Sequence, residues 1–142
     1  MKIRNAKAHW NGTLKDGNGT MDFSNYSGPF TFASRFEYGK GTNPEELIGA
    51  AHSGCYSMFL SALIGKAGFN PESIETNAAV TVGDLDGGPA ITHIELVSRV
   101  KCADLTEEKF NELALAAKAG CPVSRLYEGS TAKIDLDAKL VG

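Results

Sequence analysis

Three cysteines are the residues of this chain best suited to covalent chemistry. They are Cys55, Cys102 and Cys121, and none of them belongs to a CxxC motif. An odd number of cysteines without paired spacing does not fit the disulfide framework of a small secreted protein. We therefore expect any cysteine chemistry here to be reactive rather than structural.

The sequence surroundings of the three thiols differ. Cys55 follows small residues at 50–54 within a helical pattern, which leaves room for a ligand or another chain; a buried, inert thiol is the alternative. Cys121 precedes Pro122 at the expected start of a helical turn, where free N–H groups and the helix dipole favour a thiolate; a gap-filling loop residue is the alternative. Cys102 follows an alternating strand, and we interpret it as structural.

Arg35 and Glu45 are the charged candidates for activating a thiol. A lone arginine on a strand is usually solvated, and Glu45 and Glu46 would both stabilise a helix start. At about 100° per residue, Glu45 lies about 80° around the helix from Cys55 and Glu46 about 180°, so Glu45 is the better candidate. Their ten-residue separation spans roughly 15 Å. Either Arg35 bridges part of that gap or Glu45 comes from a second subunit, and we favour the second subunit.

A zinc site is a further possibility for these residues. His52 and Cys55 are three residues apart on one predicted helix and could bind zinc together with Cys121. A four-ligand structural site needs another Cys or His, but His9 and His93 lie on predicted strands without ligand-pair spacing. We therefore expect no metal and no other bound cofactor.

The N-terminal half must position Arg35 and Cys55. Alternating residues predict a hairpin over 6–23 and a strand over 30–37 that directs Arg35 to its polar face, with a loop over 25–29 between them. A capping pattern, Asn43-Pro44-Glu45-Glu46, predicts a helix over 43–67. From Leu47 to Ala67 this helix is mostly apolar or small all round, which predicts burial on most sides.

The C-terminal half alternates strands with helices. The predicted elements are strands over 74–82 and 90–101 joined by a loop over 83–89, a helix from Thr106 to Gly120 with Phe110, Leu113, Ala114 and Ala117 as its inner stripe, a helical turn from Pro122, and a strand over 132–140. The resulting order, β-β-β-α-β-β-α-β, has hairpins and few crossovers. It favours a single α+β domain over 1–142 with antiparallel sheets.

Composition excludes several classes of protein. The 142 residues are 42% hydrophobic and 22% charged, which suits one compact domain. The 14 basic and 17 acidic residues are scattered and give a net charge of -3, so no nucleic-acid surface is indicated. Charged residues lie among the first seven positions, where a secretion signal would need an apolar stretch. We count no apolar run whose length approaches the roughly 20 residues of a membrane span. We expect a cytoplasmic protein without nucleic-acid or membrane partners.

Four stretches of the sequence resemble one known family. They are Ala8–Gly12, Arg35–Glu37, Gly41–Cys55 and Ala117–Ser124. They resemble the OsmC/Ohr family of hydroperoxide reductases, most closely its OsmC branch, and the likeness covers essentially the whole chain. It implies an α+β, OsmC-like fold with a long central helix carrying Cys55, in an intertwined homodimer with two sites at the subunit interface. The implied activity is that of a thiol peroxidase acting on organic hydroperoxides and less readily on hydrogen peroxide.

The resemblance also implies roles for individual residues. Cys55 would be the peroxidatic cysteine and Cys121 the resolving one, with Arg35 and Glu45 as the activating pair. An external dithiol, for which a lipoyl-type donor is one candidate, would then reduce the Cys55–Cys121 disulfide. Cys102 is outside the family pattern.

General thiol chemistry agrees with this interpretation. An unperturbed cysteine is only about 3% thiolate at pH 7, and the thiolate is the nucleophile. Lowering its pKa by about two units corresponds to roughly 2.7 kcal/mol, a reasonable contribution from one buried arginine held by a carboxylate. The alternative function is a non-enzymatic peroxide sensor, or a carrier of apolar ligands, that uses the same disulfide as a switch.

Overall fold

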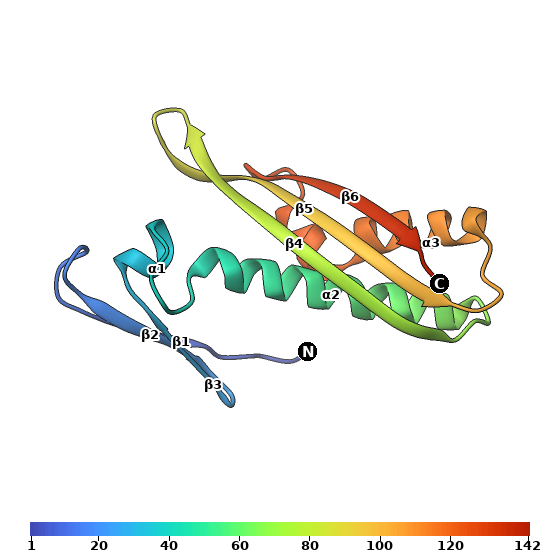
Figure 1. Ribbon diagram of the computed structural model, residues 1–142, viewed down its shortest axis with the longest axis horizontal. Coiled ribbons are helices and arrows are strands. Elements are labelled where there is room, and N and C mark those ends of the chain that lie inside the picture. The colour runs from blue at the N-terminus through green and yellow to red at the C-terminus, as the bar shows by residue number, and fades with distance from the viewer. The chain divides into compact units, whose positions relative to one another are not determined.

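The computed structural model describes residues 1–142, which form two compact units, Met1–Leu47 and Ile48–Gly142. Figure 1 labels the helices and strands. In chain order they are β1 (Lys7–Asn11), β2 (Asn18–Phe23), β3 (Tyr26–Phe30), α1 (Phe32–Phe36), α2 (Pro44–Lys66), β4 (Pro71–Leu85), β5 (Gly88–Cys102), α3 (Glu107–Gly120), α4 (Pro122–Tyr127) and β6 (Lys133–Leu140).

The first unit is built on an antiparallel sheet of order β1-β2-β3. The predicted hairpin is confirmed, since β1 pairs with β2 from Lys7 opposite Asp22 onward. The predicted loop over 25–29 is wrong. Phe23 pairs directly with Tyr26, so the chain reverses within two residues and continues as β3; Ser24, with a φ of 46°, makes this tight turn possible.

The predicted strand over 30–37 is also wrong, because Phe32–Phe36 forms the short helix α1. Thr31 caps this helix: its Oγ1 accepts a hydrogen bond from the Ser34 N–H at 3.1 Å. The Ser34 hydroxyl in turn accepts one from the Thr31 N–H at 2.9 Å. These reciprocal bonds satisfy N–H groups of the first turn and favour a helix despite the alternating phenylalanines. Arg35 therefore lies on a helix rather than on a strand face.

The predicted start and end of the long helix α2 are confirmed. Asn43 caps it, since its Oδ1 accepts a hydrogen bond from the Glu46 N–H at 2.8 Å and its Nδ2 donates to the Glu46 carboxylate at 2.9 Å. Gly68, with a φ of 96°, follows its last turn. Within the single chain, however, burial is confined to one stripe, formed by Gly49, His52, Tyr56, Leu60 and Ile64. Apolar residues on other faces remain accessible, as at Met58, which is 78% exposed.

By length and composition, α2 is also apolar enough to cross a membrane. This corrects the sequence-based expectation that no apolar run approaches that length. The core helices of soluble proteins pass the same test, so the property is weak evidence for a membrane span. Three α2 residues, Tyr56, Leu60 and Ile64, are fully buried in the protein core.

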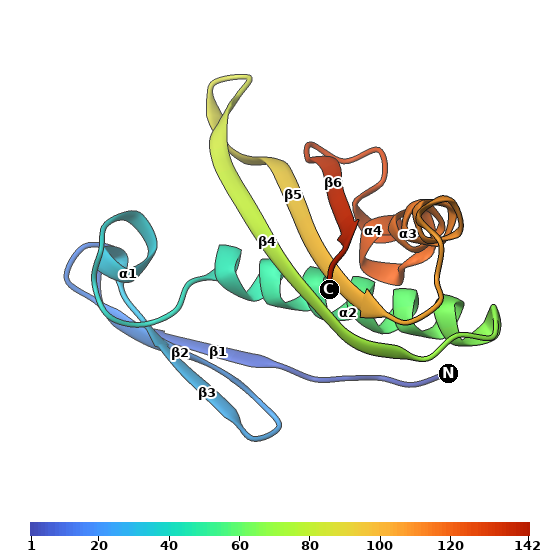
Figure 2. The same ribbon diagram turned by 45° about the vertical axis from the view of Figure 1, so that its right-hand side comes forward.

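The second unit is built on a sheet of order β4-β5-β6 (Figures 1 and 2). Strands β4 and β5 form a long hairpin in which Leu85 pairs with Gly88, so the predicted loop over 83–89 shrinks to Asp86 and Gly87. Strand β6 pairs with β5 in parallel, which corrects the prediction of antiparallel sheets. The reason is the crossover through α3 and α4, which returns the chain to the end of the sheet where β5 begins.

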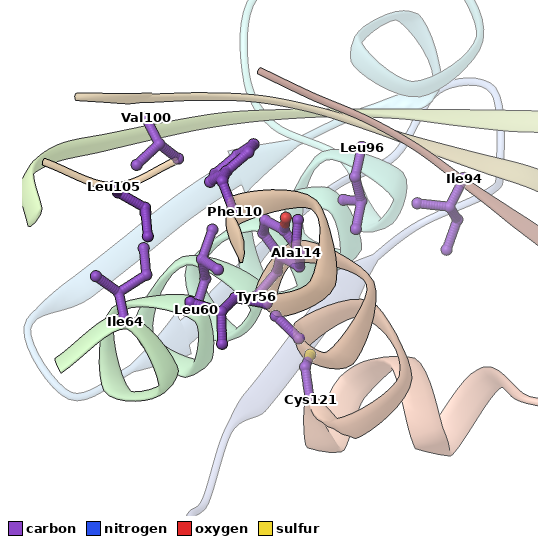
Figure 3. Close-up of a cluster of buried hydrophobic side chains, with 12 residues drawn as sticks. Tyr56, Leu60, Ile64, Ile94, Leu96, Val100, Leu105, Phe110, Ala114 and Cys121 are labelled. Carbon is purple, nitrogen blue, oxygen red and sulfur yellow. The ribbon is translucent and has the colours of Figure 1, made fainter. Parts of the chain in front are cut away.

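The core of the second unit lies between this sheet and the helices (Figure 3). Residues Ile94, Leu96 and Val100 of β5 face Tyr56, Leu60 and Ile64 of α2 and Phe110 of α3. The predicted inner stripe of α3 is confirmed, since its four members are buried. Each buried Leu, Ile or Phe side chain contributes about 1.5–3 kcal/mol. Cys121 is a fully buried member of this core, and its sulfur points into the cluster.

Candidate active site

The structure brings Cys55 and Cys121 together. Their sulfurs are 3.1 Å apart, with the Cys121 thiol donating toward the Cys55 sulfur. Both are free thiols; Cys55 is half-buried and Cys121 is buried. A disulfide bond is about 2.05 Å long, so the sulfurs need to approach by only about 1 Å to form one. The pair can therefore alternate between dithiol and disulfide with little movement of the backbone.

The backbone around Cys121 explains its fixed position. Helix α3 ends at Gly120, where a Cβ would lie 2.8 Å from the Phe59 ring, so a larger residue would displace that ring. The Cys121 N–H still donates to the Ala117 carbonyl at 3.0 Å. Its Sγ accepts a hydrogen bond from the Ser124 N–H at 3.5 Å and so caps α4, as the predicted helical turn requires. Cys121 thus joins the two helices, as the C-cap of α3 and the N-cap of α4.

The protein environment of Cys55 disfavours its charged form. Burial raises the pKa of the Cys55 thiol, and a hydrogen bond with the backbone of Val123 opposes part of that rise. The thiolate is the reactive form, so another group must favour it before Cys55 becomes a good nucleophile. Burial and Asp104 also raise the pKa of Cys102, which lies at the end of β5.

Arg35 and Glu45 form an ion pair within the first unit. Arg35 Nη2 donates to Glu45 Oε1 at 2.7 Å, and Nε donates to both carboxylate oxygens at 3.2 and 3.3 Å. The Glu45 side chain is 12% exposed and the Arg35 side chain 40%. This fork geometry fixes the plane of the guanidinium and leaves Nη1 for another partner. The pairing of these two predicted residues is thus present in the structure.

An apolar hollow of about 240 Å³ lies beside Arg35 in the same unit. Its other lining residues are Trp10, Leu14, Phe30, Thr31, Phe32 and Phe36. The guanidinium carbon lies 5.2 Å from the centre of the Phe36 ring, close enough for a cation–π contact. The hollow could not be expected from a strand over 30–37, because it forms only when Phe32–Phe36 is a helix.

His52 is the buried polar residue nearest in sequence to Cys55. Its Nε2 forms a 2.7 Å hydrogen bond with the Ser124 hydroxyl, whereas its Nδ1 is buried without a partner. Burial lowers the pKa of His52. His52, Cys55 and Cys121 do not form a metal-ligating cluster, so the structure gives no support to the zinc interpretation. Ser124 was not singled out from the sequence, although it lies three residues after Cys121.

The two pairs of candidate residues belong to different units. Arg35 and Glu45 lie in the first unit, and Cys55 and Cys121 in the second. Glu45 and Cys55 are both on α2, ten positions apart. The cysteine pair and the surrounding fold define an α+β protein with a dithiol centre.

Comparisons with known proteins identify the family. Residues 37–137 match the family model described as OsmC-like protein. The chain is 47% identical over 142 residues to Peroxiredoxin OsmC of Escherichia coli (strain K12), covering 96% of each chain. Among solved structures, an OsmC like protein from Mycoplasma pneumoniae has a TM-score of 0.82 at 17% identity, covering 99% of each chain. Organic hydroperoxide resistance protein OhrB of Bacillus subtilis has a TM-score of 0.71 at 26% identity, covering 95% of this chain and 98% of OhrB.

The chain therefore belongs to the OsmC-like family. The resemblance stated from the sequence motifs is confirmed, and so is the α+β, OsmC-like fold of the single chain that it implied.

Proposed function

We propose that this protein is a cytoplasmic, thiol-dependent peroxidase that reduces organic hydroperoxides, and less readily hydrogen peroxide, without a bound cofactor. The relative that is 47% identical carries the name Peroxiredoxin OsmC, which supports a peroxide-reducing activity. The observation that carries the proposal is the 3.1 Å pairing of a half-buried Cys55 with a buried Cys121.

Cys55 takes the part of the attacking thiol because it is the more accessible of the two. Its thiolate attacks one oxygen of the hydroperoxide; the S–O bond forms, the O–O bond breaks, and the leaving alkoxide takes a proton to become the alcohol. Cys55 is thereby oxidised to a sulfenic acid. Cys121 has no exposed surface, so a hydroperoxide cannot reach its sulfur in place of that of Cys55.

Arg35, oriented by Glu45, is assigned the activation of Cys55. Because burial raises the pKa of Cys55, a fixed positive charge is needed to favour the thiolate. The three hydrogen bonds from Arg35 to the Glu45 carboxylate hold the guanidinium in one orientation. The apolar hollow beside Arg35 suits the organic part of a hydroperoxide better than hydrogen peroxide.

A homodimer completes the proposed site. Ten positions on one straight helix correspond to roughly 15 Å, too far for direct contact between the side chains of Glu45 and Cys55. We therefore assign the Arg35–Glu45 pair that serves each Cys55 to a second copy of the chain. Exposed apolar residues of α2, such as Met58, are consistent with an interface there.

Cys121 is assigned the resolving step. Its sulfur attacks the sulfenic acid of Cys55; the S–S bond forms, the S–O bond breaks, and the hydroxide leaves with the proton of the Cys121 thiol as water. An external dithiol, for which a lipoyl-type compound is a candidate, then reduces the disulfide and is itself oxidised. The next cycle begins from the two thiols.

Turnover with excess dithiol tests the proposal. Reduced protein is mixed with cumene hydroperoxide or hydrogen peroxide, and peroxide loss is followed in the wild type, Cys55→Ser and the control Cys102→Ser. We expect many equivalents to be consumed, a preference for the organic peroxide, loss of activity in Cys55→Ser and retention in Cys102→Ser. Consumption that stops near one equivalent would favour a sensor, and equal loss in Cys55→Ser would refute the assignment.

A second variant separates the roles of the two cysteines. Cys121→Ser is expected to complete one round of peroxide reduction and then to accumulate Cys55 sulfinic acid, because no thiol captures the sulfenic acid. Mass spectrometry of the oxidised peptides identifies the modified residue. Sulfinic acid on Cys121 of the wild-type protein, in place of Cys55, would reverse the two roles.

A further inference from the structure

Two side-chain contacts connect α2 to the first turn of α4. Cys55 contacts Cys121, and His52 bonds to Ser124. The spacing is three residues on each element, and the order is reversed, so the earlier residue of α2 meets the later residue of the turn. The two contacts therefore lie side by side, about one helical turn apart. The His52–Ser124 hydrogen bond thus lies next to the Cys55–Cys121 contact.

Ser124 is the residue through which this hydrogen bond reaches Cys121. Its hydroxyl is 2.7 Å from His52 Nε2, while its backbone N–H donates to the Cys121 sulfur at 3.5 Å. One residue is thus tied to α2 by its side chain and to the resolving sulfur by its backbone. A shift of Ser124 would move the cap of α4 and with it Cys121.

His52 is an unexpected residue for a purely structural position. It is fully buried, and its Nδ1 has no hydrogen-bond partner. An unsatisfied buried polar group lowers stability, which an apolar side chain of similar size would avoid. Departures of this kind from local packing rules are expected at functional sites. Burial lowers the pKa of His52 and so favours its neutral imidazole beside the thiols.

We propose that the His52–Ser124 hydrogen bond positions Cys121 for the resolving step. This inference rests on the proposed peroxidase function. Once Cys55 carries the sulfenic oxygen, the Cys121 sulfur must stay beside Cys55 to displace that oxygen, because a second hydroperoxide competes by oxidising Cys55 to the sulfinic acid. The hydrogen bond holds the α4 turn in place during that interval. It therefore sets how much Cys55 becomes disulfide and how much is over-oxidised.

Three variants form a matched set for the test. Ser124→Ala removes the hydroxyl and keeps the backbone N–H. His52→Gln carries an amide that can reach the Nε2 position, and His52→Asn, shorter by one methylene, cannot. Each variant is oxidised at a series of cumene hydroperoxide concentrations without reductant. Mass spectrometry gives the ratio of Cys55 sulfinic acid to Cys55–Cys121 disulfide, and the rate of the first peroxide consumed is measured separately.

We expect Ser124→Ala and His52→Asn to raise the ratio of sulfinic acid to disulfide by about fivefold, the factor corresponding to one net hydrogen bond. His52→Gln should stay within about twofold of the wild type, and the first-step rate should change by less than about twofold in all three variants. Because His52→Asn also loses one more buried methylene than His52→Gln, a higher ratio in His52→Asn supports the hydrogen bond only together with a higher ratio in Ser124→Ala, which removes the hydroxyl alone.

The outcomes separate this inference from the proposed function. A wild-type protein that forms no Cys55–Cys121 disulfide with hydroperoxide would refute the peroxidase and the inference with it. A wild type that forms the disulfide, together with an unchanged ratio in Ser124→Ala, would refute the positioning role alone. Equal ratios in His52→Gln and His52→Asn would also refute the positioning role, and this result would do so even if Ser124→Ala fails to fold.

Discussion

Oxidation of Cys55 and Cys121 to a disulfide should raise the free energy of unfolding by about 4 kcal/mol. The two residues are 66 positions apart, so the bond closes a long loop and removes conformational entropy from the unfolded chain. In the chain-entropy model, a loop of this length gives roughly 4 kcal/mol at 25 °C. Little of this gain should be lost to native-state strain, because the thiol sulfurs already lie 3.1 Å apart.

Urea unfolding of reduced and oxidised protein measures the effect. The oxidised sample is prepared with one equivalent of hydroperoxide, and protein concentration is held constant because a dimer would make stability depend on it. With a typical slope of about 1–3 kcal/mol per molar urea, the gain of about 4 kcal/mol should raise the midpoint by roughly 1.3 to 4 M. The control Cys102→Ser should keep the whole shift, whereas Cys55→Ser and Cys121→Ser should lose it.

Two results would contradict this reasoning. A wild-type gain below about 1 kcal/mol, with the disulfide intact by mass spectrometry, would show that strain cancels the entropic gain. A shift that persists in Cys55→Ser or disappears in Cys102→Ser would show that a different pair of cysteines forms the bond.

Three further outcomes follow from the charged and buried polar groups. Arg35→Ala should raise the pKa of Cys55 and slow its alkylation at neutral pH, by about tenfold for each unit by which the pKa rises; an unchanged alkylation profile would exclude the activating role. Tyr56→Phe should leave stability unchanged or raise it by about 1 kcal/mol, because the buried Tyr56 hydroxyl has no hydrogen-bond partner; thermal unfolding measures this, and a clear loss would contradict it. Burial lowers the pKa of His52, so as the pH is lowered below the ordinary histidine pKa of about 6.5, His52 takes up a proton in the unfolded chain before it does so in the folded one. The free energy of unfolding should therefore decrease as the pH is lowered below about 6.5, by up to about 1.4 kcal/mol per pH unit. Urea midpoints should show this slope in the wild type and in His9→Gln but not in His52→Gln, and equal slopes in all three would refute the assignment.

Local signals were sufficient to predict the helices that carry the thiols. The Asn43 cap and Gly68 delimit α2, and Thr106 begins α3, because these residues act on the backbone beside them. The segment Phe32–Phe36 was mispredicted because alternating phenylalanines also fit one helical turn. Reciprocal Thr31–Ser34 hydrogen bonds favour the helix in this segment, and a pattern of alternating hydrophobic residues gives no information about such bonds.

Long-range geometry explains what the sequence did not reveal. The alternation of buried and exposed residues does not give the direction of β6, because it is the same in parallel and antiparallel strands; the helical crossover between β5 and β6 is the signal that favours a parallel pair. The cysteine pair was predicted from motifs through a family resemblance. The His52–Ser124 bond was missed because it exists only when α4 packs against α2 in reversed order.

The connection between α3 and α4 consists of Cys121 alone. A residue that is the whole connection cannot swing on a loop, and the Phe59 ring beside Gly120 limits how far the two helices can shift. The backbone should therefore move little between the dithiol and disulfide states. Crystals of the dithiol form should then remain intact when they are oxidised, and the two states should share one crystal lattice. The speed of the cycle would then depend on encounters with peroxide and reductant, and no folding or unfolding of a segment would limit it.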